Sequence, residues 1–96
     1  MLLLNTQNTV DSLNNGLTEK VLTYLKENEK FRLQADLLTT KIKLQEDGIV
    51  HIIFDAPPSP ATKENFKKEE TKIAIKAAVK FALGKDVSVK YDNFNS

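Results

Sequence analysis

Few residues of this sequence have the types and spacing that acid–base or nucleophilic chemistry needs. His51 is the only histidine and the sequence has no cysteine, so a histidine–cysteine zinc cluster has no ligand set. The carboxylates come as neighbours, at Glu46-Asp47 in an expected turn and at Glu69-Glu70 on an expected helix. Neighbouring side chains on a helix point about 100° apart, so the second pair does not converge on one proton. We predict no catalytic, metal or cofactor site and expect a structural role for His51.

Two other features associated with active sites have structural explanations here. Ser59 stands directly before Pro60, at the expected start of a helix, where a serine hydroxyl caps the first turn. The glycines Gly16, Gly48 and Gly84 are isolated, so there is no glycine-rich phosphate loop and no Gly-x-x-Gly clamp for nucleic acid. The sequence therefore does not predict an enzyme.

The lysines form the clearest charged pattern. They recur every four residues along one expected helix, at Lys68, Lys72, Lys76 and Lys80. Ammonium groups one helical turn apart can contact successive phosphates of a nucleic acid. The same pattern is typical of a solvated helix face, and no arginine or aromatic residue on this line would contact bases. We keep the four lysines as candidate phosphate contacts and expect weak affinity for nucleic acid.

Length and composition limit the architecture that positions these residues. The 96 residues suffice for one domain, with 41% hydrophobic residues, 28% charged residues and a net charge of +1. Residues 60 to 91 hold eight lysines and four acidic residues, so we expect an electrostatic partner to contact the C-terminal half.

The boundaries of the domain follow from composition. Residues 1 to 12 are predicted to be a flexible N-terminal tail, residues 13 to 92 a single α+β domain, and residues 93 to 96 a C-terminal tail. The apolar run at residues 1 to 4 is too short for a signal peptide or a membrane span. We expect a cytoplasmic location and no membrane partner.

Two helices are predicted before the first strand. The first begins near Leu17 with Thr18 as its cap, ends near Asn28, and has one apolar side made by Leu13, Leu17, Val21, Leu22 and Leu25. The second is short, and its predicted apolar face is made by Phe31, Ala35 and Leu38, with Leu37 beside it.

A β-hairpin follows, and the parity of its apolar residues predicts its register. A two-residue loop would send the apolar sets of the two strands to opposite faces. A three-residue loop at residues 46 to 48 instead pairs Ile42 with Ile52 and Leu44 with Val50, and it places Gly48 in the left-handed conformation that such loops need. We predict the three-residue loop.

This register leaves Ile49, His51 and Ile53 on the other face of the hairpin. If the first two helices cover that face, the two isoleucines belong to the core. If they do not, the three residues form an exposed patch of the kind that marks a protein interface.

Residues 60 to 83 predict one long helix across the sheet. Ser59 caps its start, Gly84 ends it, and a third strand with an inward face follows at Val87, Val89 and Tyr91. Only the lysine line is expected to face water, because the apolar stripe is wide: Phe66, Ile73, Ala74, Ala77, Ala78 and Phe81, with Ile75, Val79 and Leu83 beside it. The predicted fold is α+β, in the order α-α-β-β-α-β, with a small three-stranded sheet packed against the long helix.

This arrangement resembles a known kind of domain. The resemblance is carried by residues 17 to 25, 31 to 38, 41 to 44 and 49 to 54, and by the helix end Ala82-Leu83-Gly84-Lys85-Asp86-Val87-Ser88-Val89. These segments resemble the C-terminal domain of the bacterial DNA polymerase III clamp-loader subunit gamma/tau. They are also similar to the related N-terminal domain of the replication initiator DnaA, a K-homology-like module. The tryptophan often seen in the first helix of these modules is replaced here by Val21 or Tyr24.

The resemblance implies a non-catalytic protein–protein docking module of the bacterial DNA replication machinery. Its expected partner is the replicative polymerase, the helicase or a loading factor. An alternative is a K-homology-like nucleic-acid-binding domain that uses the basic face of the long helix. A third class, a small enzyme subunit, would need a catalytic cluster supplied by a partner chain.

Overall fold

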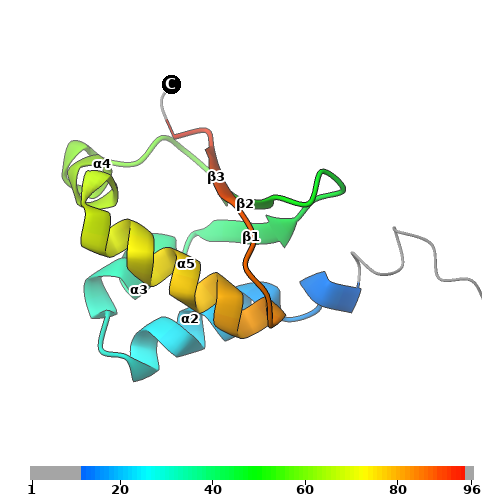
Figure 1. Cartoon of the computed structure of the whole chain (residues 1–96). Helices are drawn as coiled ribbons and strands as arrows, with labels where there is room; N and C mark the ends of the chain where they lie inside the picture. Colours follow the sequence, from blue (N-terminus) through cyan, green and yellow to red (C-terminus); the bar gives the residue numbers. More distant parts are fainter. Residues whose placement is uncertain (1–11, 95–96) are drawn as a thin grey trace, which may run out of the picture.

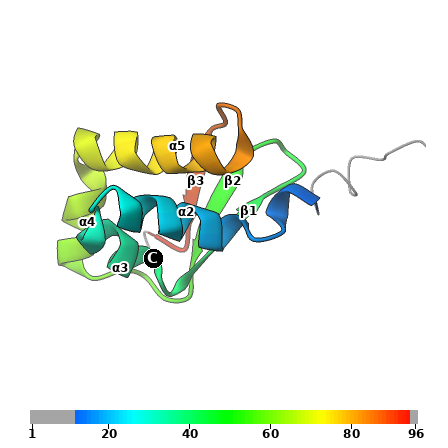
Figure 2. The same ribbon diagram turned by 90° about the horizontal axis from the view of Figure 1, so that it is seen from below.

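Helices and a small sheet form two layers in the computed structural model, which describes residues 12–94 (Figure 1). A helical turn at residues 12 to 14 comes first. The other elements are α2 (Leu17–Glu27), α3 (Phe31–Leu37), β1 (Thr40–Leu44), β2 (Val50–Phe54), α4 (Pro60–Lys67), α5 (Glu69–Leu83) and β3 (Val89–Asp92). Helices α2 and α5 lie side by side against one face of the sheet, and no described helix covers the opposite face (Figure 2). The predicted α+β class with a three-stranded sheet is confirmed.

The sheet is mixed, with strand order β1-β2-β3. Strands β1 and β2 are antiparallel and pair Ile42 with Ile52 and Leu44 with Val50, as the three-residue loop predicts. Gly48 has a φ of 80°, the left-handed conformation expected of it. Strand β3 runs parallel to β2, as expected of strands joined by a helical crossover.

The core lies between the inner face of the sheet and the helices. Each of these elements contributes apolar side chains that are at most 5% exposed: Leu17, Val21, Leu25, Leu33, Leu37, Ile42, Leu44, Val50, Ile52, Phe54, Phe66, Ile75, Ala78 and Val79. An aromatic cluster closes the end near α4, where the ring of Phe66 lies 5.8 Å from that of Phe54 and 5.5 Å from that of Tyr91.

The prediction of one unbroken helix from residue 60 to residue 83 is wrong. Lys68 has an extended backbone, with φ −70° and ψ 138°, and separates α4 from α5. In a continuous helix, the nine residues from Phe66 to Ile75 would turn through about 900°, which places the two side chains on opposite sides. The break lets both reach the core, since both are at most 2% exposed.

The predicted apolar stripe of this region is also partly wrong. The buried face of α5 is made by Thr71, Ile75, Ala78 and Val79, whereas Ile73 is 61% exposed and Phe81 is 65% exposed. Helix α5 packs against α2 and the sheet on one side only, so it needs a narrower apolar stripe than predicted (Figure 2). Lysines are therefore not the only residues of α5 that face water.

Two predictions about the first helices are wrong as well. The buried residues of α3 are Leu33 and Leu37, while Phe31 is 57% exposed and Leu38 is 60% exposed. Thr18 does not cap α2: the N-cap is Gly16, with a φ of 74° and no side-chain cap.

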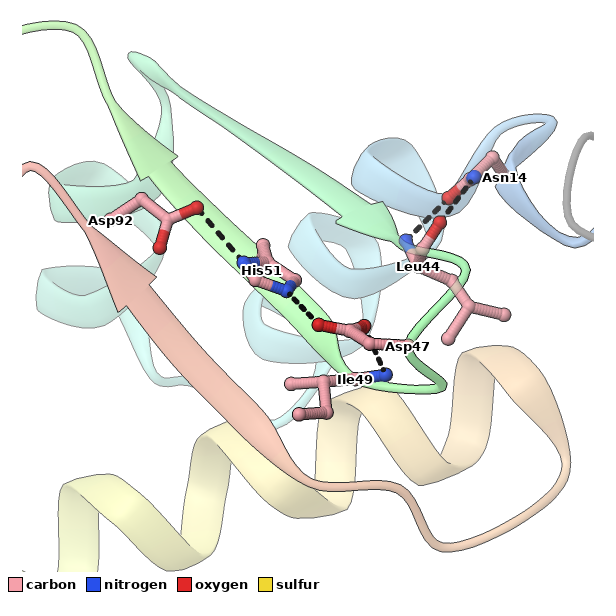
Figure 3. A network of polar contacts seen from close by, with 6 residues as sticks. All are labelled: Asn14, Leu44, Asp47, Ile49, His51 and Asp92. Carbon is pink, nitrogen blue, oxygen red and sulfur yellow. Dashed lines mark hydrogen bonds and ion pairs between the residues drawn. The ribbon is translucent and has the colours of Figure 1, made fainter.

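The side chain of Thr18 instead reaches the outer edge of β1. Its hydroxyl accepts a hydrogen bond from the N–H of Ile42 at 3.2 Å and donates to the C=O of the same residue at 3.3 Å. Asn14 does the same for Leu44: its Oδ1 accepts from the backbone N–H at 2.7 Å, and its Nδ2 donates to the C=O at 2.8 Å (Figure 3). Two side chains thus satisfy the outward-facing backbone groups of Ile42 and Leu44.

The ends of the α4–α5 region follow the predicted signals. Ser59 Oγ accepts a hydrogen bond from the N–H of Thr62 at 3.2 Å, Pro60 begins α4, and Gly84 ends α5 with a φ of 78°. The predicted N-terminal tail lies outside the described residues except for Ser12, which is in the helical turn. In the segment predicted as a C-terminal tail, Asn93 donates to the C=O of Phe54 and Phe94 packs against the core.

Candidate functional site

The first candidate surface is the face of the sheet that the helices leave open. Register places Lys43, His51 and Lys90 in one row across the three strands, and Lys41, Ile53 and Asp92 in the next row. Ile49 and Ile53 are partly exposed and are absent from the buried core. Because α2 and α3 pack against the opposite face, these isoleucines are surface residues (Figures 1 and 2).

His51 stands at the centre of this face between two carboxylates (Figure 3). Its Nε2 lies 3.0 Å from Oδ2 of Asp47 in the hairpin loop, and its Nδ1 lies 2.9 Å from Oδ2 of Asp92 at the end of β3. Asp47 is itself held in place, because its Oδ1 accepts the N–H of Ile49 at 2.9 Å. We call these three side chains, Asp47, His51 and Asp92, the histidine clamp.

The geometry of the histidine clamp favours the imidazolium ion. Both ring nitrogens face carboxylate oxygens, which only accept hydrogen bonds, so both nitrogens must carry a proton to donate. The hydrogen bond with Asp47 raises the pKa of His51 and the bond with Asp92 raises it further, while burial opposes them. The backbone N–H of Ile49 and the bond to His51 lower the pKa of Asp47.

The histidine clamp ties three segments together and is arranged for structure. Each ring nitrogen of the imidazolium donates its N–H to one aspartate, so neither nitrogen has a free lone pair with which to act as a base toward a third group. Within residues 12 to 94, no group of three histidine, cysteine, aspartate or glutamate side chains could hold a metal ion. The protonated ring of His51 lies in one row with Lys43 and Lys90, and the two aspartates offset part of the repulsion among these three positive charges.

The second candidate is the line of four lysines. Lys68 is the N-cap residue of α5, and Lys72, Lys76 and Lys80 lie exposed along this helix. Nζ of Lys80 is 3.7 Å from Oδ2 of Asp86, which forms an exposed ion pair.

Two of the lysines border a hollow between α5 and β3. It has a volume of about 330 Å³ and is lined by Lys72, Lys76, Ser88, Val89 and Tyr91. Burial raises the pKa of Tyr91, so its hydroxyl stays protonated at neutral pH. This hollow therefore includes two of the four lysines that were predicted as phosphate contacts.

The third candidate lies between α2 and α5 and was not predicted from the sequence. A hollow of about 320 Å³ is lined by Tyr24 on α2 and by Ile73, Ala74 and Ala77 on α5, with Lys30 and Glu70 at one end. A second hollow of about 250 Å³ shares Lys30, Glu70 and Ala74 with the first and adds Phe31 and Leu33 of α3. We call the two together the α2–α5 groove.

The α2–α5 groove is bordered by most of the large exposed apolar side chains of the described chain. Phe31, Ile73 and Phe81 are each more than half exposed, and Phe81 extends the groove by lying 5.1 Å from the ring of Tyr24. Exposed apolar side chains are common singly, but a contiguous row along a hollow marks a binding surface.

A signal for this row was present in the sequence. The row consists of residues four apart, Ile73, Ala77 and Phe81. At 100° per residue they lie roughly 160° to 240° around the helix from Ile75. When Ile75 faces the core, these three side chains therefore point away from it. The prediction of one continuous helix centred the apolar stripe near Ile73, and so it assigned this row to the core.

No helix within residues 12 to 94 has both the length and the apolar character that crossing a bilayer requires. Comparisons of the chain with protein-family models, with curated proteins and with solved structures each find no match.

Proposed function

We propose that this protein is a non-catalytic docking module that binds a partner protein through the α2–α5 groove. The row Ile73, Ala77 and Phe81 carries the proposal, because it exposes apolar surface beside a hollow instead of burying it. The hollow and the row are of a size that suits the apolar face of a partner segment.

The polar groups of the molecule favour docking over catalysis. The histidine clamp holds the one imidazole between two carboxylates, and Ser59 Oγ is engaged as a helix cap. Neither residue has the nucleophile-and-base arrangement that hydrolytic or transfer chemistry uses.

The resemblance to replication modules supplies the cellular setting of the proposal. In that setting the protein acts in the bacterial cytoplasm, and its partner is the replicative polymerase, the helicase or a loading factor. Ile49 and Ile53, with the buried His51 between them, are a second and smaller candidate surface for a protein partner on the sheet.

Nucleic-acid binding is the alternative, and the hollow beside Lys72 and Lys76 is the observation that favours it. We expect weak binding of a fluorescent DNA duplex at physiological salt, with no change in affinity when Lys72→Ala and Lys76→Ala are combined. Tight binding that this double substitution abolishes would favour the alternative.

Affinity capture tests the docking proposal. The immobilised protein is incubated with a bacterial cell extract, and bound proteins are identified by mass spectrometry. We expect replication proteins to be enriched by the wild type and lost with the variant that combines Ile73→Ser and Phe81→Ser.

Leu38→Ser is the matched control. Leu38 is 60% exposed, like the groove residues, but does not line either hollow of the α2–α5 groove. Its variant should capture the same proteins as the wild type. Equal capture by the Ile73→Ser, Phe81→Ser variant, or recovery of only RNA and ribosomal proteins, would overturn the proposal.

A further inference from the structure

We propose that the segment bound in the α2–α5 groove is an amphipathic helix of the partner with acidic residues along one flank, the flank that faces β3. This inference rests on the proposed docking function and adds the chemical class of the partner.

The apolar area of the groove suits a single helix better than a second copy of this chain. The three large apolar residues of the groove, Phe31, Ile73 and Phe81, are each about 60% exposed. A whole aromatic residue has about 150–250 Å² of surface, so together they expose roughly 300–400 Å² of apolar area. A stable protein–protein interface takes about 800 Å² from each partner. One amphipathic helix with apolar residues at spacings of three and four needs only a groove of this kind.

The charge of the partner follows from a second row on α5. Lys72 and Lys76 each precede a member of the apolar row by one residue, so the lysine row runs parallel to the apolar row about 100° around the helix. The apolar row is exposed and borders α2, where Phe81 contacts Tyr24, whereas Lys72 and Lys76 of the lysine row border the hollow beside β3. A helix lying on the apolar row therefore has the lysines along one of its flanks.

These two lysines lack partners within the described chain. Lys80 is paired with Asp86, but among residues 12 to 94 no carboxylate lies within 4.0 Å of Lys72 or Lys76. Carboxylates of a bound helix would complement them. At the opposite end of the groove Arg32 is paired with Asp36 at 3.5 Å, and Lys30, Glu29 and Glu70 give the lining charges of both signs, so this end does not select for one charge on the partner.

Nucleic acid fits this surface less well than a helix does. Bases stack on aromatic rings, and the middle of the row consists of the aliphatic side chains of Ile73 and Ala77. Phosphates would contact the two lysines and leave the apolar row exposed to water.

Peptide titration tests the inference. The probe is a synthetic amphipathic helix of about 18 residues, long enough to hold helical structure, with leucines on one face and glutamates on one flank. A second peptide has lysines in place of the glutamates. Fluorescence anisotropy is measured with the full-length protein at low salt and at physiological salt. We expect the glutamate peptide to bind roughly tenfold more tightly than the lysine peptide.

Variants locate the binding. Phe81→Ala should weaken binding of the glutamate peptide about tenfold through the apolar contact. Lys72→Gln combined with Lys76→Gln should weaken it about fivefold at low salt and less at higher salt. The matched control combines Lys41→Gln and Lys43→Gln, which removes two charges from the open face of the sheet and should leave affinity unchanged. Circular dichroism melts confirm that each variant is folded.

Several results would overturn the inference. If both peptides bind with equal affinity and Phe81→Ala weakens both, the groove is a docking site but the proposed acidic flank of the partner helix is wrong. If neither peptide binds while capture from extract still depends on Ile73 and Phe81, the partner class is also wrong and the docking function stands. Tighter binding of a single-stranded DNA oligonucleotide, lost with the Lys72 and Lys76 substitutions, would replace the helix with nucleic acid.

Discussion

The open face of the sheet and the exposed face of α5 use polar and apolar groups in opposite ways. On the sheet, the imidazole of His51 and its two aspartate partners satisfy one another's hydrogen bonds. On α5, Ile73 and Phe81 remain exposed, and Lys72 and Lys76 have no carboxylate partner among the described residues. A face that satisfies its own groups contributes to stability, whereas a face that leaves them unpaired is available to a partner.

The largest effect is expected within α5, where two isoleucines test the boundary between core and docking surface. Ile75 is fully buried and Ile73 is 61% exposed. Ile75→Ala should lower the free energy of unfolding by about 2–5 kcal/mol through the cavity it leaves, and Ile73→Ala by less than about 0.5 kcal/mol. Urea denaturation measures both. Equal losses would mean that Ile73 belongs to the core and that the comparison of the two faces fails.

A smaller effect is expected on the sheet. His51→Ala leaves Asp47 and Asp92 without their shared donor, and because both aspartates are partly solvated the cost should be about 1 kcal/mol. Lys43→Ala is the control, since it lies in the same row without a hydrogen bond to the clamp and should change stability by less than about 0.5 kcal/mol. Chemical denaturation at pH 6 distinguishes them. Loss of peptide affinity in the His51 variant, with stability unchanged, would make the sheet the docking face.

The smallest effect is the pH dependence of the histidine clamp. The pKa of His51 is raised by folding, so its contribution is complete below the unfolded value of about 6.5 and is lost as the pH rises through the folded pKa. The pKa of Asp47 is lowered, so its contribution is present above its ordinary pKa and is lost as the pH falls through the folded pKa. The clamp should therefore stabilise most between about pH 4 and pH 6.5.

Urea midpoints at pH 5.5 and pH 8.5 measure this effect. The wild type should lose less than about 1 kcal/mol between the two values, and His51→Gln should remove that difference. A variant that keeps the full pH dependence would assign it to groups other than the clamp. Peptide affinity should change little over the same range, because the groove does not include His51.

Some local signals in the sequence predicted local structure correctly, although the cap at Thr18 and the apolar faces of the helices were predicted wrongly. The register of the hairpin followed from the parity of Ile42, Leu44, Val50 and Ile52, and Ser59 and Gly84 marked helix ends. The break at Lys68 was not predictable in the same way, because neither glycine nor proline stands there. Its cause is the burial of Phe66 and Ile75 in one core, which is a tertiary requirement.

For the candidate surfaces, too, the sequence predicted what depends on local spacing and did not predict what depends on tertiary packing. The sequence placed Ile49, His51 and Ile53 on one face of the hairpin, but it did not bring Asp92 to His51, because that contact depends on β3 lying parallel to β2. The α2–α5 groove was not predicted, because a helix that begins at residue 60 and a helix that begins after the break at Lys68 turn different sides of residues 69 to 83 toward the core. Spacing alone gives a stripe, and packing decides which stripe faces the core.

The side chains of Asn14 and Thr18 have a consequence for self-association. An uncovered edge strand is a template on which strands of other molecules add, and repeated addition leads to fibrils. Here an incoming strand finds the donors and acceptors of Ile42 and Leu44 already occupied. The edge of β1 is thereby protected at Ile42 and Leu44 against the addition of another strand.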